Sequence, residues 1–241
     1  MDKKFAQQIL EKTWRDYDAI ASLFSETRER VYDLEPLVSS VKSGDTVLDV
    51  GCGNGRLLGA LPVGVQYVGC DTSVQMIAIA KKRCAIYKGH LCKKQGCPLC
   101  VRFVLGDVLR LPFPDASFDH VFALAVLHHI PSTALRQQAI SELVRLVKPG
   151  GRITITVWNL RSFYWMKRYR LWQLFFGLHP QGYDRGDCFV PWKRGVEKPI
   201  MRYVHAFTGW ELAKLCINGG LSLIAQSHGR SHIVVATRPV V

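Results

Sequence analysis

The chain has 241 residues, with 48% hydrophobic and 10% aromatic residues, which is sufficient for one α/β domain with a complete core. No apolar run approaches the ~20 residues of a membrane-spanning helix, and Met1-Asp2-Lys3-Lys4-Phe5 lacks the apolar core of a signal peptide. We therefore expect a cytoplasmic or nuclear protein with no membrane partner. The formal net charge of +13 is unusual for a protein that handles small neutral molecules, and it favours a polyanionic partner, chiefly nucleic acid.

Hydrophobic periodicity predicts one or two helices in residues 3–26, before the first strand. Taken in chain order, the following elements are strands at 47–50, 65–70, 102–105, 118–124 and 152–158, with helices at 73–83 and 133–147. A capped helix at 208–218 and a hairpin made of 221–227 and 232–237 complete the chain. Strands that alternate with helices predict a seven-stranded, mostly parallel α/β sheet with a C-terminal antiparallel hairpin. We expect a single domain over residues 1–241, with insertions at 84–100 and 159–200.

The most informative motif is a glycine-rich loop after the first strand. Val47-Leu48-Asp49-Val50 is followed by Gly51-Cys52-Gly53-Asn54-Gly55, and glycines allow close backbone approach to a ligand. The third glycine comes one residue earlier than in G-x-G-x-x-G. This spacing, with Asp49 just before the loop, disfavours a pyrophosphate clamp and favours a pocket for S-adenosylmethionine (SAM).

Acidic residues follow the next two strands. Asp71 comes 20 residues after Gly51, where a carboxylate would meet ribose hydroxyls, and Asp107 follows the third strand. The carboxyl ends of parallel strands share one edge of a sheet, so these acids should converge with the loop and with Ala125–His129.

With these motifs in place, residues 45–158 resemble the Rossmann-like class I SAM-dependent methyltransferases. The resemblance implies that Asp71 binds the ribose, that Asp107 lies near the adenine amino group, and that Val108 lies beside the ring. The cofactor-binding residues expected from the motifs and the resemblance are Tyr17, Asp49, Gly51, Cys52, Gly53, Gly55, Asp71, Thr72, Asp107, Val108 and Ala125.

A narrower resemblance is carried by segments outside this core. Residues 17–28, 125–129, 142–145, 156–158, 190–192 and 202–207 are similar to the methyltransferases that esterify carboxymethyluridine at the tRNA wobble position, including the domain fused to an AlkB-type dioxygenase. This resemblance implies tRNA as substrate and a small zinc-binding activator protein as partner. The catalytic residues that it implies are Arg28, His128, Trp158 and Arg202.

Individual roles follow from the chemistry of these side chains. Arg28 and Arg202 would hold the substrate carboxylate or a phosphate, because guanidinium offers paired donors. One of His128 and His129 would hydrogen-bond the base while the other packs. Trp158 and Trp192 either stack on a flipped-out uridine or belong to the core.

A cysteine cluster within 84–100 is a candidate metal site. Cys97-Pro98-Leu99-Cys100 is a C-x-x-C knuckle, and Cys92 or His90 with Cys84 would complete a structural zinc site. The set we expect is Cys84, Cys92, Cys97 and Cys100. The alternatives are reduced thiols in a solvated loop and, ranked last, an iron–sulfur cluster.

Residues 161–170 interleave basic and aromatic side chains, a composition typical of a nucleic-acid groove, although an amphipathic surface helix would show the same pattern. Two other functions remain open. Leu111–Asp119 has a pattern common among methyltransferases of small molecules such as quinone precursors, and a SAM-binding subunit without catalysis would retain the same loop.

Overall fold

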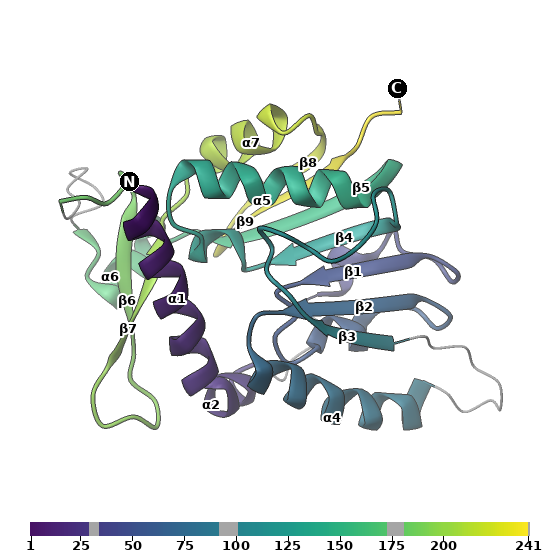
Figure 1. Cartoon of the computed structure of the whole chain (residues 1–241), viewed down its shortest axis with the longest axis horizontal. Helices are drawn as coiled ribbons and strands as arrows, with labels where there is room; N and C mark the ends of the chain where they lie inside the picture. The colour runs from purple at the N-terminus through teal and green to yellow at the C-terminus, as the bar shows by residue number, and fades with distance from the viewer. Residues whose placement is uncertain (29–33, 92–100, 173–180, 241) are drawn as a thin grey trace.

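The computed structural model describes residues 1–28, 34–91, 101–172 and 181–240, and its strands form one large sheet and one small one (Figure 1). The large sheet has seven strands in the order β3-β2-β1-β4-β5-β9-β8. Its strands are β1 (Thr46–Val50), β2 (Gln66–Asp71), β3 (Val101–Leu105), β4 (Phe118–Leu124), β5 (Val147–Trp158), β8 (Ser222–His228) and β9 (Ser231–Thr237). The helices are α1 (Lys3–Ala19), α2 (Ala21–Glu26), α3 (Glu35–Val38), α4 (Val74–Leu91), α5 (Thr133–Leu146), α6 (Phe163–Tyr169) and α7 (Gly209–Asn218), with 3₁₀ turns η1 (Arg56–Ala60) and η2 (Leu127–His129).

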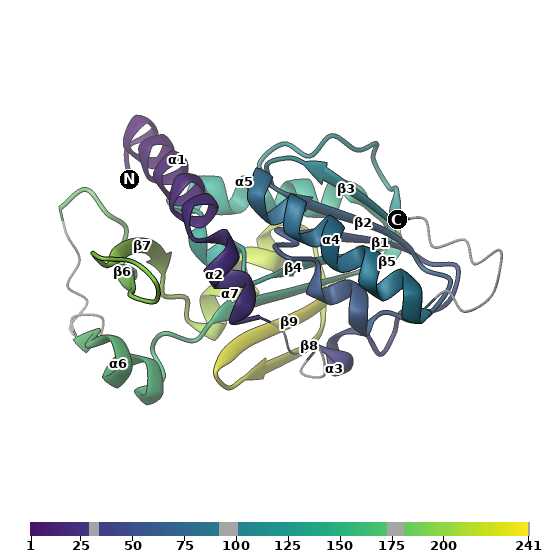
Figure 2. The same ribbon diagram turned by 90° about the horizontal axis from the view of Figure 1, so that it is seen from below.

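The strand directions confirm the predicted α/β class. β1 to β5 pair in parallel, whereas β9 runs antiparallel between β5 and β8. Both faces are covered, because neighbouring residues of β1 pack into different cores: Val47 contacts the layer that contains α3 and α4, and Leu48 the layer of α5 and α7. Figures 1 and 2 show these helices on opposite sides of the sheet.

The small sheet is a hairpin of β6 (Asp187–Trp192) and β7 (Ile200–His205). Together with α6 it packs at one end of the molecule, where α1 contacts β7 (Figure 1). The sequence pattern did not predict these strands, since Pro191 interrupts a short, continuously apolar run, Cys188–Trp192, that lacks the alternation typical of strands.

Several boundaries differ from the predicted ones. Strand β5 begins at Val147 rather than at the predicted residue 152, and its pairing shifts from Phe118↔Val147 to His120↔Arg152, where a bulge absorbs the extra residues. The first helical region is divided at Ile20 into α1 and α2. Helix α4 continues to Leu91, beyond the predicted end at 83.

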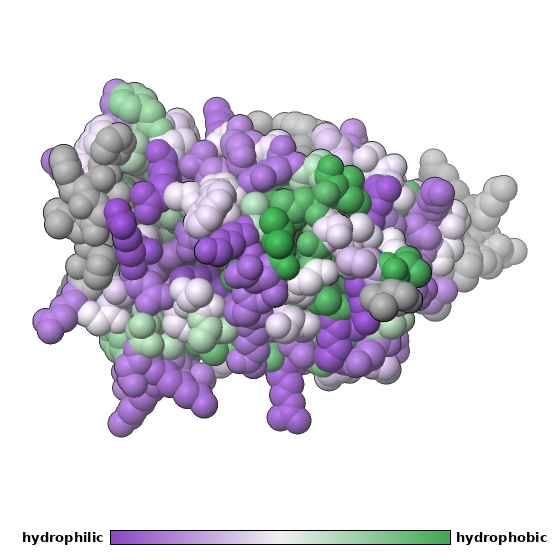
Figure 3. All heavy atoms as spheres, turned by 90° about the horizontal axis from the view of Figure 1, so that it is seen from above, coloured by the Kyte–Doolittle hydropathy of each residue, from purple (hydrophilic) through white to green (hydrophobic). Residues whose placement is uncertain are grey.

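The hydropathy of the surface differs between the middle of the molecule and one of its ends. Seen from above, hydrophobic side chains gather over the middle of the molecule, where α5 and α7 lie in Figure 1, whereas the end that carries the β6–β7 hairpin is mainly hydrophilic (Figure 3). Within the described ranges, none of the helices is sufficiently long and apolar to cross a membrane.

Candidate functional site: two adjoining cavities

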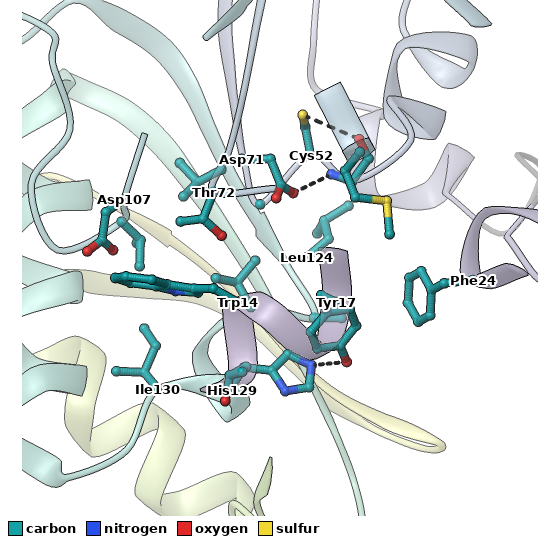
Figure 4. A pocket seen from close by; sticks show the side chains of 18 of the residues that line it. Trp14, Tyr17, Phe24, Cys52, Asp71, Thr72, Asp107, Leu124, His129 and Ile130 are labelled. Carbon is teal, nitrogen blue, oxygen red and sulfur yellow. Dashed lines mark hydrogen bonds between the residues drawn. The ribbon is translucent and has the colours of Figure 1, made fainter. Parts of the chain in front are cut away.

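The first cavity, of about 180 Å³, lies where β1, β2 and β4 end, as expected for a ligand site of an open α/β sheet (Figure 4). Helix α1 closes it from the other side with Trp14 and Tyr17. The predicted residues that line it are Tyr17, Arg28, Gly51, Cys52, Gly53, Asp71, Thr72, Asp107, Val108, Ala125 and Trp158.

The glycine loop forms one wall. Gly51, Gly53 and Gly55 have φ values of +64°, +52° and +71°, a region that side chains disfavour. A Cβ on Gly51 would overlap the side chain of Val126, so that position tolerates only glycine. A Cβ on Gly53 would have no protein atom within 4 Å, which leaves room for a ligand to approach the backbone.

The two predicted acids face this wall. Asp71 accepts hydrogen bonds from the backbone N–H groups of Gly53 at 2.8 Å and Ser73 at 2.9 Å. Burial raises the pKa of Asp71 and also that of Asp107. Carboxylates beside a bare backbone loop and apolar side chains such as Val108 fit a nucleoside with ribose hydroxyls, and therefore fit SAM.

Two predicted cofactor residues lie behind the cavity rather than on its wall. The Asp49 side chain is buried and accepts a 2.8 Å hydrogen bond from the Tyr67 hydroxyl, and burial raises the pKa of Asp49 to about 7. Gly55 faces Ala80 and Phe103 of the neighbouring layer. These residues therefore support the loop from beneath.

His129, not His128, is the histidine that lines the first cavity. Its Nδ1 lies 3.2 Å from the Tyr203 carbonyl, which only accepts, so Nδ1 carries the proton. Its Nε2 then accepts from the Tyr17 hydroxyl at 2.8 Å, and that hydroxyl accepts from Nη1 of Arg202 at 3.1 Å. Burial, with a smaller effect of Arg202, lowers the pKa of His129 to about 3, so the ring is neutral.

His128 is completely buried beneath Trp158, with the ring centroids 4.8 Å apart. Neither of its ring nitrogens has a hydrogen-bond partner among the described residues, and burial lowers its pKa well below the ordinary value. His128 therefore contacts the site only through the ring of Trp158 and that of His129.

The second cavity, of about 530 Å³, adjoins the first, and Arg28 and Trp158 line both. α6 and the β6–β7 hairpin form its other walls. Arg202 lies at this junction, 3% exposed, with its guanidinium 5.7, 5.5 and 5.3 Å from the ring centroids of Tyr17, Trp158 and Trp192.

The two arginines at the junction have no anionic partner in the described structure. None of its ion pairs involves Arg28 or Arg202, and Nε of Arg202 is buried without a hydrogen bond. Burial, with repulsion from Arg56 and Arg202, lowers the pKa of Arg28. Since a buried charge without a partner is costly, this arrangement is suited to an anionic ligand.

Residues missed in the sequence include Leu10, Thr13 and Trp14, which line the first cavity with Tyr17. Their spacing of i, i+3, i+4 and i+7 places them on one face of α1, a signal present in the sequence. The Tyr17–His129 contact depends on the packing of α1 against η2 and had no such signal.

The cysteine cluster falls largely outside the described residues. Cys92, Cys97 and Cys100 lie there, and the side chain of His90 is likewise not described. Cys84 is buried within the core layer of α3 and α4. Among the described residues, no group of three or more His, Cys, Asp or Glu side chains is placed to hold a metal.

Comparison with known proteins defines the class. A family profile described as "Methyltransferase domain" matches residues 48–155. A SAM-dependent methyltransferase structure from Methanosarcina mazei aligns over 85% of this chain and 98% of its own, at 22% identity and a TM-score of 0.66. A Haloferax volcanii methyltransferase was solved in complex with the Trm112 methyltransferase activator. It aligns over 93% of this chain and 98% of its own, at 18% identity and a TM-score of 0.61. Residues 48–155 therefore match a methyltransferase-domain family, and the chain shares the fold of SAM-dependent methyltransferases.

Within this class the chain is similar to enzymes named tRNA (carboxymethyluridine(34)-5-O)-methyltransferase. The Arabidopsis thaliana enzyme is 36% identical over 66% of this chain, which spans 33% of the plant protein's length. The Schizosaccharomyces pombe enzyme is 29% identical over 90% of this chain and 91% of its own.

Proposed function

We propose that the chain transfers the methyl group of SAM to the carboxylate of carboxymethyluridine at the wobble position of tRNA, forming the methyl ester. The observation that carries this proposal is a pair of arginines at the junction of the two cavities, the buried Arg202 and the half-buried Arg28, neither of which has an ion-pair partner among the described residues. They favour an anion next to the proposed methyl donor, and the carboxymethyluridine in the relatives' names carries a carboxylate.

The chemistry needs little from the protein beyond placement. SAM supplies a methyl group activated by its sulfonium, so a new C–O bond forms while the C–S bond breaks and its electron pair stays on sulfur. A carboxylate with a pKa near ~4 is already ionised at neutral pH, so no general base is needed. This agrees with a neutral His129 held by two hydrogen bonds. Positioning and desolvation at the aromatic junction then account for the acceleration.

The direct test is methylation of tRNA with labelled SAM, with and without an activator protein, followed by mild alkali. We expect label in tRNA that alkali releases, because an ester hydrolyses whereas a methylated base or ribose does not. Label only in small lipophilic acceptors would contradict the proposal in favour of a small-molecule methyltransferase. SAM binding without any transfer would indicate a non-catalytic subunit.

Arg202→Gln tests the anion site. We expect the KM for carboxymethyluridine tRNA to rise about tenfold or more, since a charge-assisted hydrogen bond to the substrate is lost. Affinity for SAM, measured by calorimetry, should change little. Arg194→Gln is the control, because Arg194 lines the same cavity but is exposed and already paired with Glu26. Equal effects of the two substitutions on KM would contradict the assignment.

We further propose a small zinc-binding activator as partner, supported by the fold shared with the Haloferax methyltransferase solved with Trm112. β3 is an edge strand, and Leu105 on it is 55% exposed. Leu105→Asp should abolish co-purification with a Trm112-type protein, whereas Ile224→Asp on the opposite edge strand β8 should not. Retained binding by the Leu105 variant would exclude the β3 edge as the binding surface for the activator.

The remaining proposals rest on the sequence. We propose one functional domain over residues 1–241 that acts in the cytoplasm and also in the nucleus. A fluorescent fusion of the protein would show its location.

A structural zinc at the cysteine cluster is supported only by the C-x-x-C spacing, and Cys84 is already accounted for as a core residue. Metal analysis of the purified protein should find one zinc per chain, lost in Cys97→Ser; its absence would leave a reduced loop.

A further inference from the structure

The second cavity is larger than one modified base at the arginine junction would require. Its volume is about 530 Å³, against about 180 Å³ for the first cavity. The junction residues Arg28, Arg202, Trp158 and Trp192 occupy only its inner end. The outer part is formed by α6, a segment to which the methyl transfer assigns no role.

Beginning with Trp158 at the junction, three aromatic rings follow one another in nearly parallel orientation. Trp158 and Trp165 have centroids 5.8 Å apart with planes inclined by 13°, and Trp165 and Tyr169 have centroids 5.3 Å apart with planes inclined by 6°. All three rings line the cavity. We call Trp158, Trp165 and Tyr169 the aromatic ladder.

The ladder is held by the surrounding fold. Trp165 and Tyr169 are four residues apart and so lie on one face of α6. That face packs on a small core that includes Leu160, Val190 and Val204. The Trp165 indole also donates a 3.1 Å hydrogen bond to the Arg230 carbonyl. The rings are therefore oriented before any ligand arrives, which lowers the entropic cost of binding.

The charge around the ladder selects the kind of ligand. Among the described residues, every charged side chain that lines the second cavity is basic: Arg28, Arg168, Lys193, Arg194 and Arg202. The Arg168 guanidinium lies 5.8 Å from the Tyr169 ring centroid, at the outer end. Flat rings flanked by cations fit nucleobases joined by phosphates. The rings line a concave cavity, which a flat bilayer surface does not enter.

We propose that the outer ladder, Trp165 and Tyr169, binds the unpaired nucleotide next to the acceptor nucleoside, so that the chain recognises a single-stranded RNA segment. This inference rests on the proposed function for the identity of the inner nucleoside. Stacking on protein rings requires bases released from a helix, so duplex RNA does not fit the ladder. Arg168, beside the Tyr169 ring, contacts the phosphate between the two nucleotides.

Two substitutions of Trp165 isolate the stacking surface. Trp165→Leu and Trp165→Phe both lose the indole hydrogen bond and keep an apolar side chain, but only phenylalanine keeps a ring. Trp210→Leu, at an exposed position of α7 outside both cavities, controls for loss of a tryptophan elsewhere. The probe is an unmodified single-stranded RNA with an anticodon-loop sequence, and binding is measured by fluorescence anisotropy.

We expect Trp165→Leu to weaken RNA binding about 5- to 100-fold, with Trp165→Phe and Trp210→Leu close to wild type. Annealing the probe into a duplex should weaken wild-type binding to the level of Trp165→Leu. Equal affinity of the leucine and phenylalanine variants, or tighter binding of the duplex, would overturn the proposal.

A second readout separates this proposal from the proposed function. With an acceptor RNA containing carboxymethyluridine, Trp165→Leu should raise KM by a similar factor, while KM for the free nucleoside stays unchanged. If wild-type protein methylates neither acceptor, the proposed function fails and the binding assay still decides on the ladder. If both acceptors are methylated but Trp165→Leu raises both KM values equally, the ladder fails alone.

Discussion

At the scale of single residues, the pair His128-His129 shows how burial divides two identical side chains. His129 reaches the cavity wall and has a partner on each nitrogen, Tyr17 and Tyr203. His128 is enclosed beneath Trp158 with no partner among the described residues. Both rings are kept neutral by burial, so neither is suited to act as an acid near neutral pH.

The lowered pKa of His129 predicts acid sensitivity. A histidine whose folded pKa is about 3, against about 6.5 when unfolded, takes up protons only in the unfolded chain between these values. The unfolding free energy should therefore decrease as the pH is lowered. His129 alone should contribute a loss of about 2 kcal/mol between pH 7 and pH 5. Urea denaturation of wild type and His129→Gln should show a shallower pH dependence for the variant. The same dependence in both proteins would contradict a neutral, buried His129.

At the scale of elements, the β6–β7 hairpin places Arg202 at the junction of the two cavities, and a buried hydrogen-bonded cluster fixes the hairpin to α7. Nδ1 and Nε2 of His205 lie 2.7 Å from Asp187 and 2.8 Å from Glu211, and the Tyr203 hydroxyl donates to Asp187 at 2.6 Å. Glu211 also completes the capping box of α7 with Thr208. Through Tyr203, this cluster is joined to His129 and thus to both cavities.

Asp187→Asn should be strongly destabilising. It removes a buried charge from the His205 pair, a change expected to cost about 3 kcal/mol of unfolding free energy. The matched control is Asp115→Asn, because Asp115 is an exposed side chain paired with the half-buried Arg145, and its expected cost is below about 1 kcal/mol. Urea denaturation of both variants provides the measurement. Similar losses would show that the hairpin does not depend on this cluster.

At the scale of the whole molecule, the two cavities are formed by different parts of the chain. The parallel sheet builds the cofactor cavity at its strand ends, whereas α6 and the β6–β7 hairpin, outside that sheet, build the basic cavity beside it. Part of the basic excess behind the net charge of +13 lies in the second cavity, whose charged lining residues in the described structure are all basic.

This division predicts different responses to salt. RNA binding releases counterions, so affinity for tRNA should fall roughly tenfold or more when KCl rises from about 50 to about 200 mM. SAM affinity, set in the first cavity by short contacts, should change less than about twofold. Filter binding for RNA and calorimetry for SAM would measure both. A salt-independent RNA affinity would argue against the basic cavity as the binding surface.

The sequence predicted the sheet and the glycine-loop wall of the first cavity well, because both depend on local pattern. Strand β4 matches its predicted range of 118–124, and the Gly51–Gly53 turn and Asp71 converge as expected. The substrate side was less predictable. Arg202 was singled out only by resemblance, and its position among Tyr17, Trp158 and Trp192 brings together four residues distant in sequence.

The sequence by itself determined the class of fold and the chemistry of the methyl donor's pocket, since alternating strands, helices and glycines with positive φ are encoded within short segments. Only the tertiary structure decided which histidine faces the cavity, that two arginines share one junction, and that the rings of α6 continue from Trp158. Those features arise where α1, β5, α6 and the β6–β7 hairpin pack together. Packing between distant elements depends on the shape of the whole core, which no short segment specifies.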